Sequence, residues 1–116
     1  MSNKKNWYAR VDDILESILV IEESIDGLSF EDFKSNRVLF YAVSRAIEII
    51  GEAAKNIPDD VLEKYPEGMW RGVKGMRDII AHEYARLDKE LMWNVAVQRI
   101  PDLKRTILKM IKDIGP

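Results

Sequence analysis

The sequence predicts an all-α fold, a four- to five-helix up-and-down bundle that forms a single domain over residues 1–116. Apolar residues recur at the three- and four-residue spacing of amphipathic helices along most of the chain. No segment shows the sustained two-residue alternation with hairpin turns that strands would require. With 47% hydrophobic and 33% charged residues, 116 residues can bury a core without metal or disulfide staples. Residues 1–6 are expected to form a flexible N-terminal tail.

The first long helix is expected to end near Ile25. Its apolar stripe consists of Val11, Ile14, Leu15, Ile18, Ile21 and Ile25. Gly27 follows at the position of a left-handed helix cap, and Leu28 supplies the apolar residue beyond it. Ser29 and Asp32 have the spacing of a capping box, which predicts that a short second helix starts here.

A longer helix is expected over residues 37–56, with a broad apolar surface. Its two adjoining stripes comprise Val38, Leu39, Tyr41, Ala42, Val43, Ala46, Ile47, Ile49, Ile50, Ala53 and Ala54. Two stripes indicate burial on more than one side, either by other helices or by a second subunit. The polar stripe of this helix, which is typical of a solvated face, consists of Arg45, Glu48, Glu52 and Lys55. Its two glutamates are like charges four residues apart, and a partner cation such as Arg77 would relieve their repulsion.

Prolines and aspartates indicate where helices begin and end in the second half of the chain. Pro58 and the two aspartates after it fit the first turn of a short helix, which should end before Pro66. Asp88 fits the N-cap of the last helical region. Within that region Pro101 either kinks one helix or begins another.

Between these segments a helix is expected over residues 69–82. Gly72 and Gly75 weaken it, and we expect them to permit close helix packing, with a backbone contact to phosphate as the alternative. Trp70 and Trp93 have side chains that can stack on nucleic-acid bases. Their apolar neighbours favour a place in the core or an interface instead.

The composition excludes several classes of function. Without cysteine the chain has no disulfide, no thiol catalysis and no cysteine-ligated metal centre. His82 is the single histidine, which excludes a multi-histidine metal site within one chain. A net charge of −2 argues against binding nucleic acid mainly through counterion release. No apolar run approaches the ~20 residues of a membrane helix, and no signal region is present, so we expect a cytoplasmic protein.

Arg77, His82 and Tyr84 form the most informative group of polar residues. On a straight helix Arg77 and Tyr84 lie about 20° apart, whereas His82 lies about 140° from Arg77 and joins them only near a helix end. Arginine can bind a phosphate through two donors, and histidine can transfer a proton near neutral pH. The pair therefore suits metal-free RNA cleavage. A lone histidine near a helix end is also typical of a capping or interior structural residue, and the spacing leaves both interpretations open.

The same segment resembles the Arg-x4-His-x-Tyr signature of HepT-like proteins, a branch of the HEPN superfamily, with Arg77, His82 and Tyr84 in the three signature positions. The similarity covers roughly residues 11–110 in the expected order. Its other elements are Ile50-Gly51-Glu52-Ala53-Ala54-Lys55, Trp70, Gly75-Met76-Arg77-Asp78, Leu87-Asp88, Leu91 and Trp93. Ala85-Arg86 departs from the aromatic residue and glycine that many relatives carry after the tyrosine.

The resemblance implies a metal-independent ribonuclease toxin that forms an all-α homodimer, with the two motifs facing each other across a cleft. It implies RNA as substrate and, as partner, a minimal nucleotidyltransferase antitoxin, MntA, which adds AMP to the signature tyrosine and silences the toxin. Arg77 and His82 would then be catalytic, and Tyr84 would be the modified residue. Supporting or substrate-binding roles are expected for Glu52, Asp78, Glu83 and Arg86. No metal or other cofactor is expected.

Two other functions are compatible with the same residues. In one, the chain is a non-catalytic partner of a nucleotidyltransferase, and its cleft only holds a nucleotide. In the other, it is a helical dimer in which the polar motif merely stabilises the interface.

Overall fold

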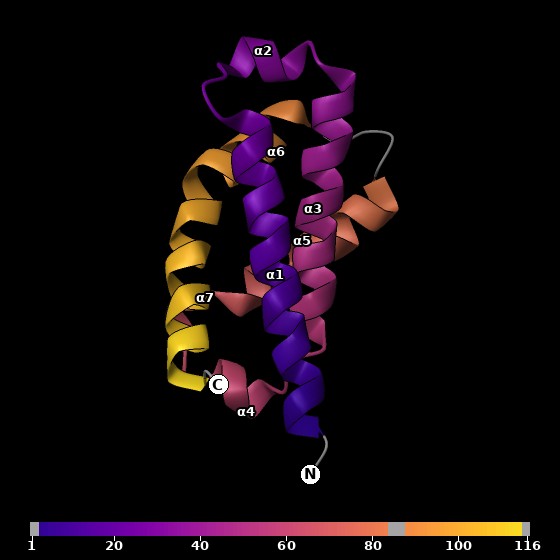
Figure 1. Cartoon of the computed structure of the whole chain (residues 1–116). Coiled ribbons are helices and arrows are strands. Elements are labelled where there is room, and N and C mark those ends of the chain that lie inside the picture. The colour runs from indigo at the N-terminus through magenta and orange to yellow at the C-terminus, as the bar shows by residue number, and fades with distance from the viewer. Residues whose placement is uncertain (1–2, 84–87, 115–116) are drawn as a thin grey trace.

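The chain is helical throughout the part that the structure describes. A computed structural model describes the backbone of residues 3–83 and 88–114, and the side chains of residues 7–80 and 88–114. All regular elements in these ranges are helices, which confirms the predicted all-α class. The elements are α1 (Asn3–Ile25), α2 (Phe30–Lys34), α3 (Arg37–Lys55), α4 (Asp59–Leu62), a 3-10 turn η1 (Pro66–Gly68), α5 (Trp70–Glu83), α6 (Lys89–Asn94), a π-helical segment η3 (Val95–Arg99) and α7 (Ile100–Ile114) (Figure 1). No helix in these ranges is long and apolar enough to cross a membrane.

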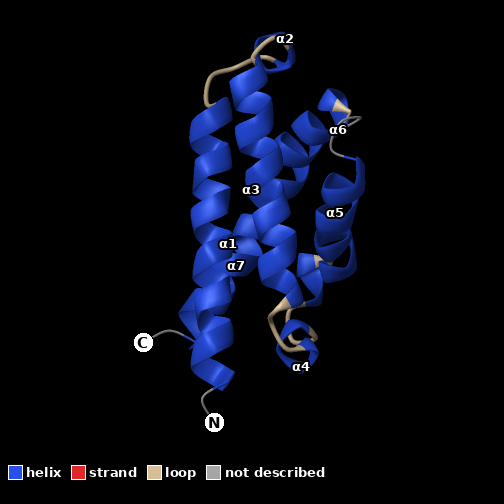
Figure 2. Cartoon of the chain, turned by 90° about the vertical axis from the view of Figure 1, so that its right-hand side faces the viewer, coloured by secondary structure: helices blue, strands red, loops and turns tan. Residues whose placement is uncertain are grey.

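Four longer helices build the bundle, and shorter ones connect them. Helices α1 and α3 lie side by side in both views (Figure 1, Figure 2). Helix α5 packs against α3, and α7 packs against α1. Helix α2 lies at one end of the α1–α3 pair and α4 lies toward the other (Figure 2). The predicted four- to five-helix bundle is confirmed in this arrangement.

The predicted start and stop signals act where the sequence places them. Gly27 ends α1 with a φ of +73°, a left-handed conformation that costs glycine no strain. The Ser29 hydroxyl accepts from the Asp32 backbone N–H, and the Asp32 carboxylate accepts from the Ser29 N–H, so the capping box is complete. Asp88 caps α6 by accepting from the N–H groups of Glu90 and Leu91. At the N-terminus the expected tail over residues 1–6 is too long, because α1 already begins at Asn3.

Helix α3 is buried on two sides within the chain itself. Helix α1 covers one side of α3 and α5 covers another. The buried residues of α3 are Phe40, Val43, Ser44, Ala46, Ile47, Ile50, Gly51, Ala53 and Ala54. Other helices of the chain therefore cover much of the doubled apolar stripe, whereas its members Val38 and Tyr41 remain exposed at 75% and 46%.

The close approach between α3 and α5 occurs at a glycine of α3. A Cβ atom placed on Gly51 would lie 2.7 Å from the Arg77 Cβ and 2.9 Å from the Val73 carbonyl oxygen. At Gly72 and Gly75 an added Cβ would meet nothing within 4 Å. The prediction that Gly72 and Gly75 permit close packing is therefore wrong within this chain. Sequence spacing alone does not show which glycine faces a neighbouring helix.

Pro101 lies in the first turn of α7, which continues from α6 through the π-helical segment. A proline has no N–H to donate to the carbonyl one turn earlier. The wider turns of Val95–Arg99 change the hydrogen-bond pairing just before this residue, so the chain stays helical across it. Pro101 therefore marks a helix start inside a continuous helical region.

Both tryptophans in question pack with the core. Trp70 is buried, and its indole N–H donates to the Tyr65 carbonyl oxygen at 2.8 Å. Trp93 is half-buried, with its ring centroid 5.4 Å from that of Phe33. The interpretation of these residues as side chains that pack with the core is confirmed.

Candidate functional site

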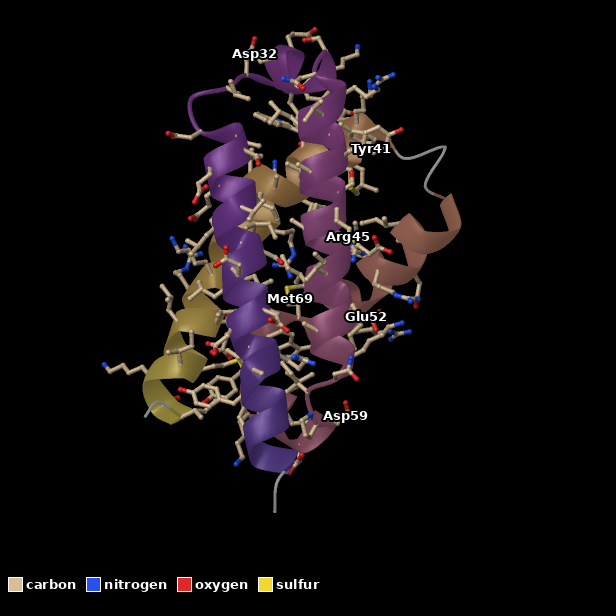
Figure 3. The ribbon with its side chains drawn as sticks, turned by 45° about the vertical axis from the view of Figure 1, so that its right-hand side comes forward. Asp32, Tyr41, Arg45, Glu52, Asp59 and Met69 are labelled. Atoms are coloured by element: carbon tan, nitrogen blue, oxygen red, sulfur yellow. The ribbon has the colours of Figure 1, made fainter. Side chains whose placement is uncertain are left out.

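Arg77 reaches the surface along the backbone of α3. Its Cβ lies over Gly51, and the next residue of α3, Glu52, points along the same side of the helix as Arg45 (Figure 3). Because Gly51 has no side chain, the aliphatic stem of Arg77 can pass this point and bring the guanidinium beside Glu52. The side chain of Arg77 is 36% exposed, so the guanidinium is held by the protein and still open to solvent.

Two carboxylates orient the guanidinium. Arg77 Nε donates to Glu52 Oε1 at 2.7 Å, and Arg77 Nη1 donates to Asp78 Oδ1 at 3.4 Å. The hydrogen bond and charge of Glu52, followed by those of Asp78, raise the pKa of Arg77 above its ordinary value. Arg77 is therefore charged at any pH at which the protein is folded.

A second cation, Lys55, completes the group. Lys55 Nζ donates to Asp78 Oδ1 at 2.7 Å, the same oxygen that faces Arg77. This hydrogen bond is the largest cause that lowers the pKa of Asp78 below its ordinary value. Lys55 lies in the last turn of α3, where the helix dipole favours a cation. We call Glu52, Lys55, Arg77 and Asp78 the α3–α5 charge cluster.

The polar stripe of α3 is divided between the surface and this cluster. Arg45 binds Glu48 at 3.0 Å, whereas Glu52 binds Arg77. Each glutamate thus has its own cation, as expected for two like charges four residues apart. An open groove of about 360 Å³ runs from Arg77 over the exposed side of α3 to Arg10 of α1.

The structure brings together three of the predicted site residues, Glu52, Arg77 and Asp78. The backbone of His82 and Glu83 lies in the last turn of α5, and the side chains of both are outside the described residues. Tyr84 and Arg86 are outside the described residues altogether.

Lys55 and Gly51 were not predicted as site residues. Lys55 stands three residues after Glu52 on the polar stripe, which could have pointed to a shared site. Within the described residues, no three His, Cys, Asp or Glu side chains gather to hold a metal ion. The described residues of the site show a guanidinium held between two carboxylates.

A family model described as ribonuclease HepT-like matches residues 14–110. The chain belongs to the ribonuclease HepT-like family. A protein of Thermococcus cleftensis named "Probable ribonuclease HepT" is 42% identical over 109 residues, which cover 94% of this chain and 99% of that one. Two Methanocaldococcus jannaschii proteins that carry RNase names are 40% and 35% identical, each over 96% of this chain and 92% of its own length. No solved structure shows a significant match.

These comparisons confirm the resemblance that the signature residues indicate. The HepT-like match includes α3 and α5, and therefore all four residues of the α3–α5 charge cluster. The relatives align over nearly their whole length, so the similarity concerns the complete HepT-like bundle rather than a shared segment.

Proposed function

We propose that this HepT-like protein is an RNA endonuclease that needs no metal ion, with Arg77 and His82 as its catalytic residues. Its membership of a ribonuclease family supports the substrate and the reaction. The observation that carries the site is the guanidinium of Arg77, which is fixed by Glu52 and Asp78 yet open to solvent. A preorganised cation of this kind stabilises charge that develops on a phosphate.

In the proposed reaction Arg77 holds the scissile phosphate. Arg77 donates hydrogen bonds to other described residues through Nε and Nη1 only, so the donors on Nη2 are available to the substrate. His82 removes the proton from the 2′-hydroxyl, whose oxygen attacks the phosphorus. The bond to the 5′-oxygen breaks, that oxygen takes up a proton from water, and His82 returns the proton it accepted to the solvent. The products are a 2′,3′-cyclic phosphate and a 5′-hydroxyl.

RNA cleavage by the purified protein should persist in excess EDTA, because general acid–base catalysis by His82 requires no metal ion. The measurement is cleavage of a labelled RNA before and after chelation, with analysis of the new ends. Activity that disappears with EDTA and returns with magnesium would contradict the proposed mechanism. Binding of RNA or nucleotide without cleavage would favour the non-catalytic alternative.

We further propose that the protein is a homodimer in which the two motifs face one cleft. Exposed apolar side chains, including Val38 at 75% and Ile79 at 44%, leave apolar surface that a partner can cover. Light scattering should give about twice the 13.5 kDa chain mass, with an interface above ~1,000 Å² expected for a stable pair. A monomer at tens of micromolar would contradict both the proposed homodimer and the shared cleft.

The proposal extends to a toxin of the cytoplasm that an MntA-type nucleotidyltransferase silences by attaching AMP to Tyr84. An added phosphodiester anion would pair with a nearby arginine and block the place of an RNA phosphate. Tyr84→Phe should therefore cleave RNA and stay active when incubated with such a partner and ATP, whereas the unchanged protein should gain AMP mass and lose activity.

The other tyrosines supply the controls for this experiment. Tyr65 is buried, and its hydroxyl donates to Asp113 at 2.9 Å, so it is a poor acceptor for AMP. Tyr8→Phe and Tyr41→Phe should remain sensitive to the nucleotidyltransferase. If Tyr84→Phe still gains AMP mass and loses activity, then the regulated tyrosine is a different one.

A further inference from the structure

Asp78 lies between two cations and cannot serve both equally. Its Oδ1 atom accepts from Lys55 Nζ at 2.7 Å and from Arg77 Nη1 at the longer distance of 3.4 Å. Lys55 comes from α3, 23 residues earlier in the chain, and crosses to α5 to make this contact. The geometry assigns the stronger hold on Asp78 to Lys55, because a charge-assisted hydrogen bond weakens as it lengthens.

The sum of charges explains why this contact matters to Arg77. Without Lys55, the two carboxylates of Glu52 and Asp78 would outnumber the single guanidinium between them. With Lys55, the four charges of the α3–α5 charge cluster balance. A phosphate that approaches Arg77 must compete with the carboxylates already bound to it, so a cation that occupies Asp78 leaves more of the guanidinium to the phosphate.

We propose that Lys55 is a positioning residue for the RNA-binding site: it holds Asp78 so that Arg77 remains available to a substrate phosphate. The proposal rests on the proposed function, since it assigns the same site a phosphate as ligand. Lys55 acts on the RNA through Asp78 and Arg77, and it does not touch the phosphate itself.

The test is a double-mutant cycle that reads binding rather than cleavage. The probe is a fluorescent RNA oligonucleotide methylated at every 2′-oxygen, which cannot be cleaved by 2′-hydroxyl attack. Lys55→Met should weaken its binding about tenfold, a typical coupling between charged neighbours in one network. Asp78→Asn in the Lys55→Met background should restore binding to near the wild-type level, because the carboxylate of Asp78 then no longer competes for Arg77, and Glu52 holds it as in the wild type.

Lys74→Met is the matched control. Lys74 lies on α5, three residues before Arg77, and binds Asp59 at 3.1 Å, away from the α3–α5 charge cluster. Like Lys55→Met, this variant removes one lysine charge and breaks one ion pair with an aspartate of another element. Its effect on binding should be at most about twofold, as expected for a charge outside the network.

A second readout follows Asp78 without RNA. In Lys55→Met the pKa of the Asp78 carboxyl, measured by carbon-13 NMR, should rise toward its ordinary value, because its shortest hydrogen bond is lost. In Lys74→Met it should stay low. If Lys55 had a merely structural role, its replacement would lower the midpoint of unfolding. That change alone would not raise the pKa of Asp78 in Lys55→Met above its value in Lys74→Met.

Three results would overturn the proposal. Lys55→Met could bind the probe as tightly as wild type, or the double variant could bind as weakly as Lys55→Met, which would mean that Lys55 attracts RNA directly. If the wild-type protein does not bind the probe at all, then the site does not bind an RNA phosphate. By contrast, wild-type protein that binds the probe but leaves unmodified RNA intact would contradict only the ribonuclease activity.

Discussion

Replacing either Arg77 or His82 with alanine should lower the rate of RNA cleavage by about 100-fold or more, the usual scale for a lost phosphate-binding or acid–base group. Arg77→Ala removes the guanidinium that Glu52 and Asp78 hold in place. His82→Ala removes the only histidine in the chain, so no second imidazole of the same subunit can replace it. The measurement is kcat/KM on a labelled RNA, together with thermal unfolding of each variant.

The control for Arg77→Ala is Arg71→Ala. Arg71 is an exposed residue of the same helix, so its removal changes the net charge equally without touching Glu52 or Asp78. Cleavage by Arg71→Ala should stay close to the wild-type rate. Unfolding temperatures should change little in all three variants, because exposed ion pairs contribute little to the free energy of folding. If Arg77→Ala or His82→Ala unfolds while its folded fraction cleaves normally, then that residue is structural.

The second large effect is expected at Gly51. In Gly51→Ala the new methyl group would lie 2.7 Å from the Arg77 Cβ and 2.9 Å from the Val73 carbonyl oxygen, so α5 must move outward. Overpacking of this kind destabilises proteins by about 1–3 kcal/mol, which thermal unfolding will measure. The loss of cleavage should be larger than the loss of stability implies, because a displacement of ~1 Å at a positioned catalytic group can cost about 100-fold in rate.

Glycines on α5 provide matched controls for this substitution. An added Cβ at Gly72 or Gly75 meets nothing within 4 Å, so Gly72→Ala and Gly75→Ala should fold at least as well as wild type. Alanine in a helix interior is favoured over glycine by roughly 0.5–1 kcal/mol. Wild-type cleavage and stability in Gly51→Ala would show that the close approach of α3 and α5 is dispensable. Lost cleavage in Gly75→Ala would instead point to a contact between that backbone and substrate or partner.

The helices and their ends could be predicted from the sequence because their signals are local. The left-handed turn at Gly27 and the capping box of Ser29 and Asp32 depend on neighbouring residues only. The helical period of α3 likewise indicated a broad buried surface, and α1 and α5 cover the part of it that is buried. The same pattern could not say whether a helix of this chain or a second subunit covers that surface, since hydrophobic burial has no direction.

The candidate site was only partly predictable for a different reason. Glu52 was expected near Arg77, because its repulsion from Glu48 called for a cation, and the two residues do form an ion pair. The choice of Gly51 over Gly72 and Gly75 as the close-packing residue depends on how α5 lies across α3. So does the reach of Lys55 to Asp78, which joins residues of two helices. Contacts of this kind are set by tertiary packing, which helical periodicity does not encode.

The packing of α7 against α1 determines the order in which the molecule can be completed. Helix α3 contacts both α1 and α5, which lie on either side of it in the chain, whereas α7 contacts α1 from the far end of the sequence. The ion pair between Lys104 and Glu22 joins residues 82 positions apart and requires both ends of the chain. Part of the apolar surface of α1 therefore has no partner until the last helix has been synthesised. The α3–α5 pair that carries Arg77 lies entirely before α7 in the chain, so all of its residues are made before the helix that covers α1.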